Sequence, residues 1–88
     1  MDKQTYKIAV VGNRDAILPF RLIGFQTYPV TEPQEAINTL RKLSRENFGI
    51  IYLTEDIAQA IPDTVAFYDQ QLTPALILIP THRGPTGL

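Results

Sequence analysis

The fold follows from the stretch Ile50-Ile51-Tyr52-Leu53, four apolar residues in a row near the middle of the chain. Two further runs have the same character, Ile8-Ala9-Val10-Val11 and Ala75-Leu76-Ile77-Leu78-Ile79. Apolar residues that follow one another without alternation are typical of strands covered on both faces of a sheet. The three runs therefore predict buried strands of a parallel sheet. A weaker strand is predicted from Gly24 to Tyr28, where an interrupting polar residue indicates an edge position.

Helical patterns lie between the predicted strands. The first helix is expected from Asp15 to Ile23, with Gly24 as its stop, because glycine commonly ends helices. The second has Thr31 and Gln34 at capping-box spacing, with a proline in its first turn. Its apolar residues recur at helical spacing and predict a buried face made of Ala36, Ile37, Leu40 and Leu43.

A third helix is expected to begin after Thr54, which has the residue type of an N-cap. Acidic residues follow directly in its first turn, where the helix dipole favours them. The helix is expected to break at Pro62 and to resume through Val65 and Tyr68.

Strands and helices thus alternate, which predicts a parallel sheet with right-handed crossover connections. Placing the weak strand at an edge gives the strand order 2-1-3-4, a receiver-like or flavodoxin-like topology. In that order the first helix covers one face of the sheet alone, and the later helices share the other face. The face under the first helix is then short of cover, although the third and fourth strands are apolar on both sides.

Residues 1–80 are interpreted as a single α/β domain, and residues 81–88 as a loop leading toward a C-terminal helix that is absent. Two explanations for the uncovered face stay open. The chain is a shortened form of a longer protein, or a partner fills the gap.

Charge and composition exclude several classes of function. The 88 residues are 44% hydrophobic and 19% charged, and eight Lys and Arg against nine Asp and Glu give a net charge of −1. Nucleic-acid binding usually needs a strong basic field, which this balance does not supply. Binding to anionic membrane surfaces is disfavoured on the same ground.

The absence of cysteine excludes disulfides, thiolate metal sites and cysteine nucleophiles. No apolar run approaches the length of a membrane-spanning helix, and residues 1–4 lack the apolar core of a signal peptide. We therefore expect a soluble, cytoplasmic protein.

The turn Gly12-Asn13-Arg14-Asp15 occupies the usual ligand position of such a sheet, after the first strand. It contains neither the glycine pattern of a dinucleotide-binding turn nor the Lys-Ser/Thr of a P-loop. Two interpretations stay open. The helix N-terminus attracts an anion with help from Arg14, or the turn is structural and Asn13 or Asp15 caps the helix.

Other chemical signals are isolated. Asp15, Glu55 and Asp56 invite comparison with phosphorylatable receiver domains, but the position that ends the third strand is Thr54, and no lysine follows Lys42. The one histidine, His82, has no neighbouring group that would complete a catalytic triad or a metal site. We therefore expect no catalytic residue, no cofactor and no metal.

The chain resembles the F subunit family of V-type and A-type rotary ATPases. The likeness covers nearly all 88 residues and is carried by four stretches: Tyr6-Lys7-Ile8-Ala9-Val10-Val11-Gly12, Pro19-Phe20-Arg21-Leu22-Ile23-Gly24-Phe25, Phe48-Gly49-Ile50-Ile51-Tyr52-Leu53-Thr54-Glu55 and Leu72-Thr73-Pro74-Ala75-Leu76-Ile77-Leu78-Ile79-Pro80. The resemblance implies a non-catalytic part of the central rotor stalk, bound to the coiled coil of the D subunit. The catalytic A and B hexamer would lie nearby, with the whole assembly peripheral to the membrane in the V1 sector. A receiver-like signalling domain and a small anion-binding domain are the alternatives.

Partner contacts are expected at the first helix and the edge strand. Phe20, Ile23, Phe25 and Tyr28 are large apolar groups on a poorly covered edge, and Arg21 lies among them. Aromatic residues with arginine are the composition typical of an interface core. Phe20 and Phe25 have ordinary core packing as an equal alternative. Arg83, in the loop after the last strand, is the remaining candidate. Together with His82 it contacts a phosphate or a partner carboxylate, or it is a solvated loop residue.

Overall fold

The computed structural model describes residues 7–81 of the chain. Its elements in chain order are β1 (Lys7–Gly12), α1 (Arg14–Leu22), β2 (Gln26–Pro29), α2 (Pro33–Ser44), β3 (Phe48–Thr54), α3 (Glu55–Ala60), α4 (Pro62–Asp69) and β4 (Ala75–Ile79). This order confirms the predicted alternation of strands and helices. Arg83 and His82 lie outside the described residues.

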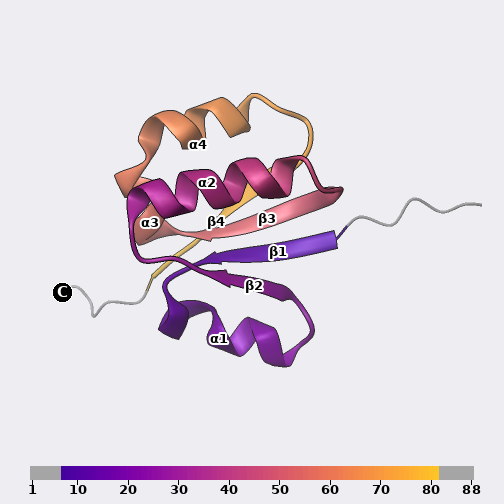
Figure 1. Ribbon diagram of the computed structural model, residues 1–88, viewed down its shortest axis with the longest axis vertical. Helices are drawn as coiled ribbons and strands as arrows, with labels where there is room; N and C mark the ends of the chain where they lie inside the picture. The colour runs from indigo at the N-terminus through magenta and orange to yellow at the C-terminus, as the bar shows by residue number, and fades with distance from the viewer. Residues whose placement is uncertain (1–6, 82–88) are drawn as a thin grey trace, which may run out of the picture.

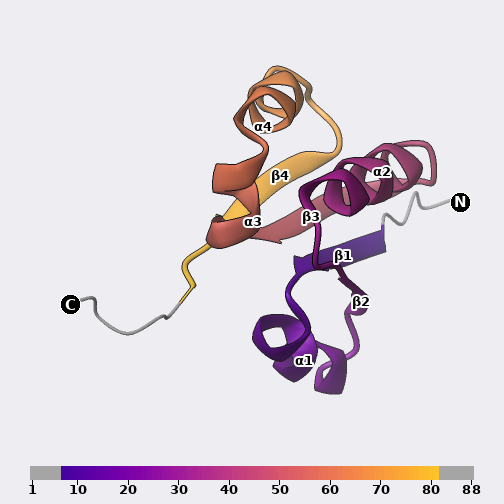
Figure 2. The ribbon, with the colours of Figure 1, turned by 60° about the vertical axis from the view of Figure 1, so that its left-hand side comes forward.

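All four strands form one parallel sheet in the order β2-β1-β3-β4, which confirms the predicted topology. Helix α1 lies on one side of the sheet, and α2, α3 and α4 lie on the other (Figure 1, Figure 2). Right-handed crossovers require this division, because the step from β1 to β2 runs across the sheet in the opposite direction from the later steps.

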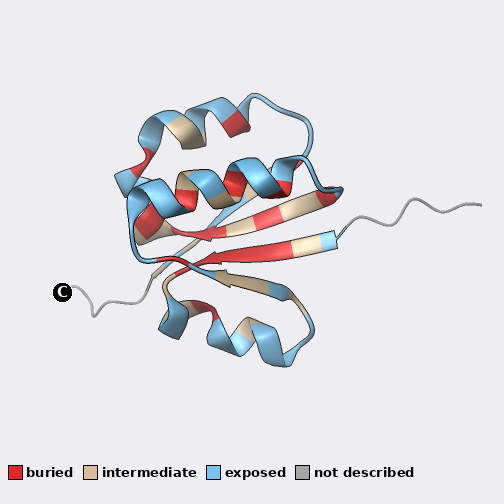
Figure 3. Cartoon of the chain, viewed as in Figure 1, coloured by how far each residue is buried: buried red, intermediate tan, exposed pale blue. Residues whose placement is uncertain are grey.

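The main core lies between the sheet and the helices α2, α3 and α4. The central strands contribute buried residues that alternate along β1 and β3 and point to this side: Ala9, Val11, Ile51 and Leu53. The predicted apolar face of α2 is confirmed, with Ala36, Leu40 and Leu43 buried and Ile37 partly buried against the same cluster. Figure 3 shows this burial along the strands and along the sheet-facing side of α2.

The opposite face of the sheet has less cover. Val10 is buried there, and the register aligns it with Tyr52 and Ile77 on the neighbouring strands. Tyr52 is half-buried, whereas Ile77 is 41% exposed. The predicted shortage of cover is therefore confirmed at β4. Whether a longer chain or a partner covers this face stays a prediction.

The start of α2 differs from the expected capping box. Pro33 is the first helical residue, so Glu32 occupies the N-cap and Thr31 precedes it. The side chain that reaches back is Glu35, whose Oε1 accepts hydrogen bonds from the backbone N–H groups of Thr31 (2.9 Å) and Glu32 (3.4 Å). A carboxylate is a stronger acceptor than the amide of Gln34, which instead donates to Asn38 at 3.1 Å.

Thr54 is the N-cap residue of α3, as expected, but its hydroxyl makes no capping hydrogen bond to the helix. The side chain is 1% exposed, and its Oγ1 is buried without a hydrogen-bond partner in the described part of the chain. The predicted break before Pro62 is confirmed, since α3 ends at Ala60 and α4 begins at Pro62. The edge strand begins two residues later than predicted, because Gly24 and Phe25 complete the end of α1.

Candidate partner-binding groove

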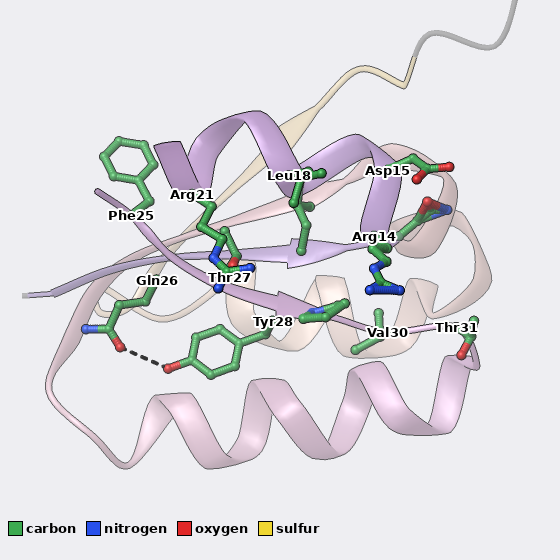
Figure 4. A pocket seen from close by; sticks show the side chains of 13 residues that line it. Arg14, Asp15, Leu18, Arg21, Phe25, Gln26, Thr27, Tyr28, Val30 and Thr31 are labelled. Atoms are coloured by element: carbon green, nitrogen blue, oxygen red, sulfur yellow. Dashed lines mark hydrogen bonds between the residues drawn. The ribbon is translucent and has the colours of Figure 1, made fainter. Parts of the chain in front are cut away.

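A groove of about 940 Å³ runs between α1 and the edge strand β2. Its walls come from α1, from β2 and from the short segment that follows β2 (Figure 4). The residues that line it include Arg14, Leu18, Arg21, Thr27 and Tyr28. Three of the residues expected to meet a partner, Arg21, Phe25 and Tyr28, line this groove.

The end of α1 is fixed to β2 by a Schellman motif. Gly24 has φ +94°, the left-handed region that favours glycine. Its N–H donates to the carbonyl of Arg21 at 3.1 Å, and the N–H of Phe25 donates to the carbonyl of Phe20 at 3.2 Å. These are the two hydrogen bonds that define the motif. The turn therefore sets the angle between the helix and the strand that form the groove.

An aromatic stack completes this turn. The ring centroids of Phe20 and Phe25 lie 6.1 Å apart, and the angle between the ring planes is 12°. The ring centroids of Phe25 and Tyr52 are also 6.1 Å apart, with an angle of 9° between the planes. The contact between Phe20 and Phe25 is the apolar contact that commonly accompanies a Schellman motif. Both phenylalanines are half-buried. Packing within the chain thus accounts for these two residues, and they hold α1 against the sheet.

Tyr28 lies on the other side of the edge strand. Its position in β2 aligns it with Val11, whose side chain faces α2. The ring meets that of Phe48 edge to face at 6.2 Å, and the hydroxyl donates to Oε1 of Gln26 at 3.1 Å (Figure 4). Burial, with a smaller contribution from the negative charge of Glu46, raises the pKa of the Tyr28 hydroxyl. Tyr28 is therefore a neutral, oriented hydrogen-bonding group at the rim of the groove.

The other two expected contact residues in the described part of the chain, Phe20 and Ile23, do not line the groove. Ile23 is 67% exposed at the C-terminal end of α1 and is not among the groove-lining residues. Two other residues, Arg14 and Leu18, are not indicated as partner contacts by the sequence, although both line the groove. Leu18 follows Arg14 by four residues, and Arg21 follows Leu18 by three. This helical spacing places all three side chains on one stripe of α1. That spacing is the signal that identifies them.

At the carboxyl ends of β1 and β3 the chain packs closely against itself. Gly12 ends β1 beside the buried side chain of Thr54, and a Cβ added at Gly12 would lie 2.5 Å from Thr54 Oγ1. The glycine here admits a threonine side chain from the neighbouring strand. Asn13 occupies the N-cap position of α1, but no side chain makes a capping hydrogen bond there, so the cap predicted for Asn13 or Asp15 is not formed. Nearby, Asp56 accepts a hydrogen bond from the N–H of Ile57 at 2.8 Å, a local role at the start of α3.

Two features are absent from residues 7–81. No three carboxylate or histidine side chains in that range lie close enough to hold a metal ion. In the same range, no helix has the length and apolar character needed to cross a bilayer.

The fold and the groove define a class: a small, doubly wound parallel α/β domain with a recess beside an edge strand. Residues 8–88 match the family described as ATP synthase (F/14-kDa) subunit, so the chain belongs to that family. It is 42% identical over 86 residues to the V-type ATP synthase F subunit of Fusobacterium nucleatum, covering 98% of this chain and 82% of the relative.

Relatives occur in archaea as well. The A-type ATP synthase F subunit of Methanothermobacter thermautotrophicus is 40% identical over 81 residues, which cover 90% of this chain and 76% of the relative. The crystal structure of the V-type ATP synthase F subunit from Archaeoglobus fulgidus has the same fold. It superimposes with a TM-score of 0.72 at 23% identity, covering 85% of this chain and 98% of that one.

Proposed function

We propose that this chain is the F subunit of a V/A-type ATP synthase and serves as a non-catalytic part of its central rotor. The observation that carries this proposal is the family match, which extends over residues 8–88. As a rotor component, the chain would help to couple ATP hydrolysis or synthesis to ion transport while other subunits hold the nucleotide. It would lie in the cytoplasmic V1 sector, close to the A and B subunits and peripheral to the membrane.

We further propose that the groove between α1 and β2 binds the coiled coil of the D subunit. A groove of about 940 Å³ is large enough to receive one face of a helix. Arg21 and Tyr28 bring the residue types that often dominate the energy of an interface. The Schellman turn holds both sides of the groove in place, so little ordering would be needed on binding.

Binding of purified D subunit from the same organism tests this function. Wild-type chain is expected to form a stable complex with it, measurable by calorimetry and by co-elution in size-exclusion chromatography. Arg21→Ala and Tyr28→Ala should each weaken that binding by more than about 1 kcal/mol, as expected for interface anchors. Arg45→Ala, which removes an exposed arginine near the end of α2 on the other side of the sheet, is the matched control.

Two outcomes would contradict the proposal in different ways. Failure of the wild-type chain to bind the D subunit would reject the rotor function. Normal binding by both groove variants, with a loss in the Arg45→Ala control, would move the interface to the α2 side of the sheet.

A further inference from the structure

The groove-facing stripe of α1 has a regular chemical pattern. Arg14, Leu18 and Arg21 are related by steps of four and three residues, so they lie along one side of the helix. Seven residues of helix correspond to about 10.5 Å along the axis. Two positive charges are therefore set two helical turns apart, with an apolar residue between them. Leu18 is 48% exposed, which leaves its side chain available for contact.

Both cationic groups are directed at the groove. Figure 4 shows the guanidinium groups of Arg14 and Arg21 extending from α1 toward β2. The one acidic side chain among the described lining residues is Asp15, and its carboxylate is directed away from Arg21. The groove is thus positive although the chain as a whole has a net charge of −1. A partner with carboxylates at matching positions would be recognised by charge complementarity.

The edge strand favours a helix over an added strand as the occupant. The N–H of Val30 donates to the carbonyl of Gly12 at 2.9 Å, so it points toward β1. Because successive N–H groups of a strand point in opposite directions, those of Thr27 and residue 29 belong to the open edge. Residue 29 is proline and has no N–H. Thr27 is then the only backbone donor that β2 offers to a new strand, which makes strand addition weak.

Taken together, these features specify the occupant, and this inference rests on the proposed function. We propose that the groove binds an α-helix of the D subunit that carries two acidic residues seven positions apart, with an apolar residue between them. The acidic pair forms ion pairs with Arg14 and Arg21, and the apolar residue packs on Leu18. The spacing fixes the longitudinal register of the F subunit on the coiled coil, which a purely apolar contact would leave loosely specified.

Removing the charges of Arg14 and Arg21 tests whether ion pairs hold the helix of the D subunit in the groove. Arg14→Gln/Arg21→Gln is expected to bind the D subunit about 10- to 100-fold more weakly than wild type, since interfacial charge pairs couple strongly. Wild-type affinity should also fall as salt is raised, and the double variant should lose most of that dependence. Arg41→Gln/Arg45→Gln, which removes two exposed arginines near the end of α2, is the matched control and should bind like wild type. Thermal melting confirms that each variant is folded.

A charge reversal identifies the partner residues. With Arg14→Glu/Arg21→Glu as bait, single and paired substitutions of the acidic residues of the D subunit by lysine are screened for restored binding. Restoration is expected only for a pair seven positions apart.

Each contrary result has a distinct meaning. If wild-type chain binds the D subunit and the double glutamine variant binds equally well, the acidic-helix inference is wrong while the proposed function stands. If wild-type chain does not bind the D subunit, both are wrong. If the isolated chain sediments as a dimer that Arg14→Gln/Arg21→Gln dissociates, the groove belongs to a second copy and the inference is overturned.

Discussion

A methyl group added at Gly12 should disturb the junction between β1 and α1. The Cβ of Gly12→Ala would lie 2.5 Å from Oγ1 of Thr54, closer still to its Cγ2, and 3.0 Å from its Cβ. Ordinary contacts between such atoms lie at about 3.5–4.0 Å, so the overlap is about 1 Å. Thr54 is β-branched and 1% exposed, and therefore has little freedom to rotate away.

Moving β1 away from β3 to relieve this overlap would also cost free energy. Val11 and Leu53, the neighbours of the two residues, are aligned in the ladder between β1 and β3 and are fully buried. We expect Gly12→Ala to lower the free energy of unfolding by about 2–3 kcal/mol, at the upper end of the range for overpacking a core. Thr54→Ala removes the two nearest atoms, so in the double variant about 1–2 kcal/mol of this loss should be recovered as a coupling energy.

Urea denaturation of the two single variants and the double variant measures this coupling. Thr54→Val is the matched control, because it keeps the bulk of the side chain and removes only the unpartnered hydroxyl. Thr54→Val should therefore not reduce the loss of stability caused by Gly12→Ala. On its own it should not destabilise the protein. A Gly12→Ala variant within about 0.5 kcal/mol of wild type would refute the packing argument. The packing argument would also be refuted if Gly12→Ala lowered the free energy of unfolding by the same amount in the Thr54→Ala background as in wild type.

Two further predictions concern the rest of the domain. Hydrogen bonds from the N–H groups of Thr31 and Glu32 lower the pKa of Glu35 from its ordinary 4.5, so its stabilising effect is complete above pH 4.5 and is lost as pH falls through the lower folded pKa. The melting temperature of wild type should therefore fall more steeply below pH 4.5 than that of Glu35→Gln, and parallel curves would contradict this. Ile77→Thr should reduce the fluorescence of an apolar dye bound to the bare sheet face, whereas Leu72→Thr, a change at a 94% exposed loop residue, should not; equal losses would argue against a continuous apolar face.

The strands and most helices could be predicted because their signals are local. Runs of apolar residues between glycines and prolines mark the strands, and the spacing of Ala36, Leu40 and Leu43 marks the buried side of α2. The capping-box spacing places the start of α2 one residue too early, although proline favours the first helical position and Pro33 therefore points to Glu32 as the N-cap. Giving that preference more weight corrects the expectation.

The site was harder to predict because it depends on which side of the edge strand each residue faces. Phe25 and Tyr28 are three residues apart, an odd separation that puts them on opposite sides of an extended chain. Phe25 belongs to the aromatic stack beneath α1, whereas Tyr28 lies at the rim of the groove and faces α2. The two residues therefore do not form one patch, as the sequence had suggested. The stripe of Arg14, Leu18 and Arg21 is visible in the spacing, but its relevance depends on where the chain returns as β2. The contact between Gly12 and Thr54 joins distant parts of the sequence and leaves no local signal.

The proposed function places the coiled coil of the D subunit on the side of the domain that bears α1 and β2. Photocrosslinking of the assembled complex tests it most directly, with p-benzoylphenylalanine placed at position 18 in one variant and at position 67 in another. Leu18 lies in the groove and Phe67 lies on α4, across the sheet, and the two are similarly exposed at 48% and 57%. We expect a crosslink to the D subunit from position 18 and none from position 67. A crosslink to the D subunit from position 67 alone would contradict it.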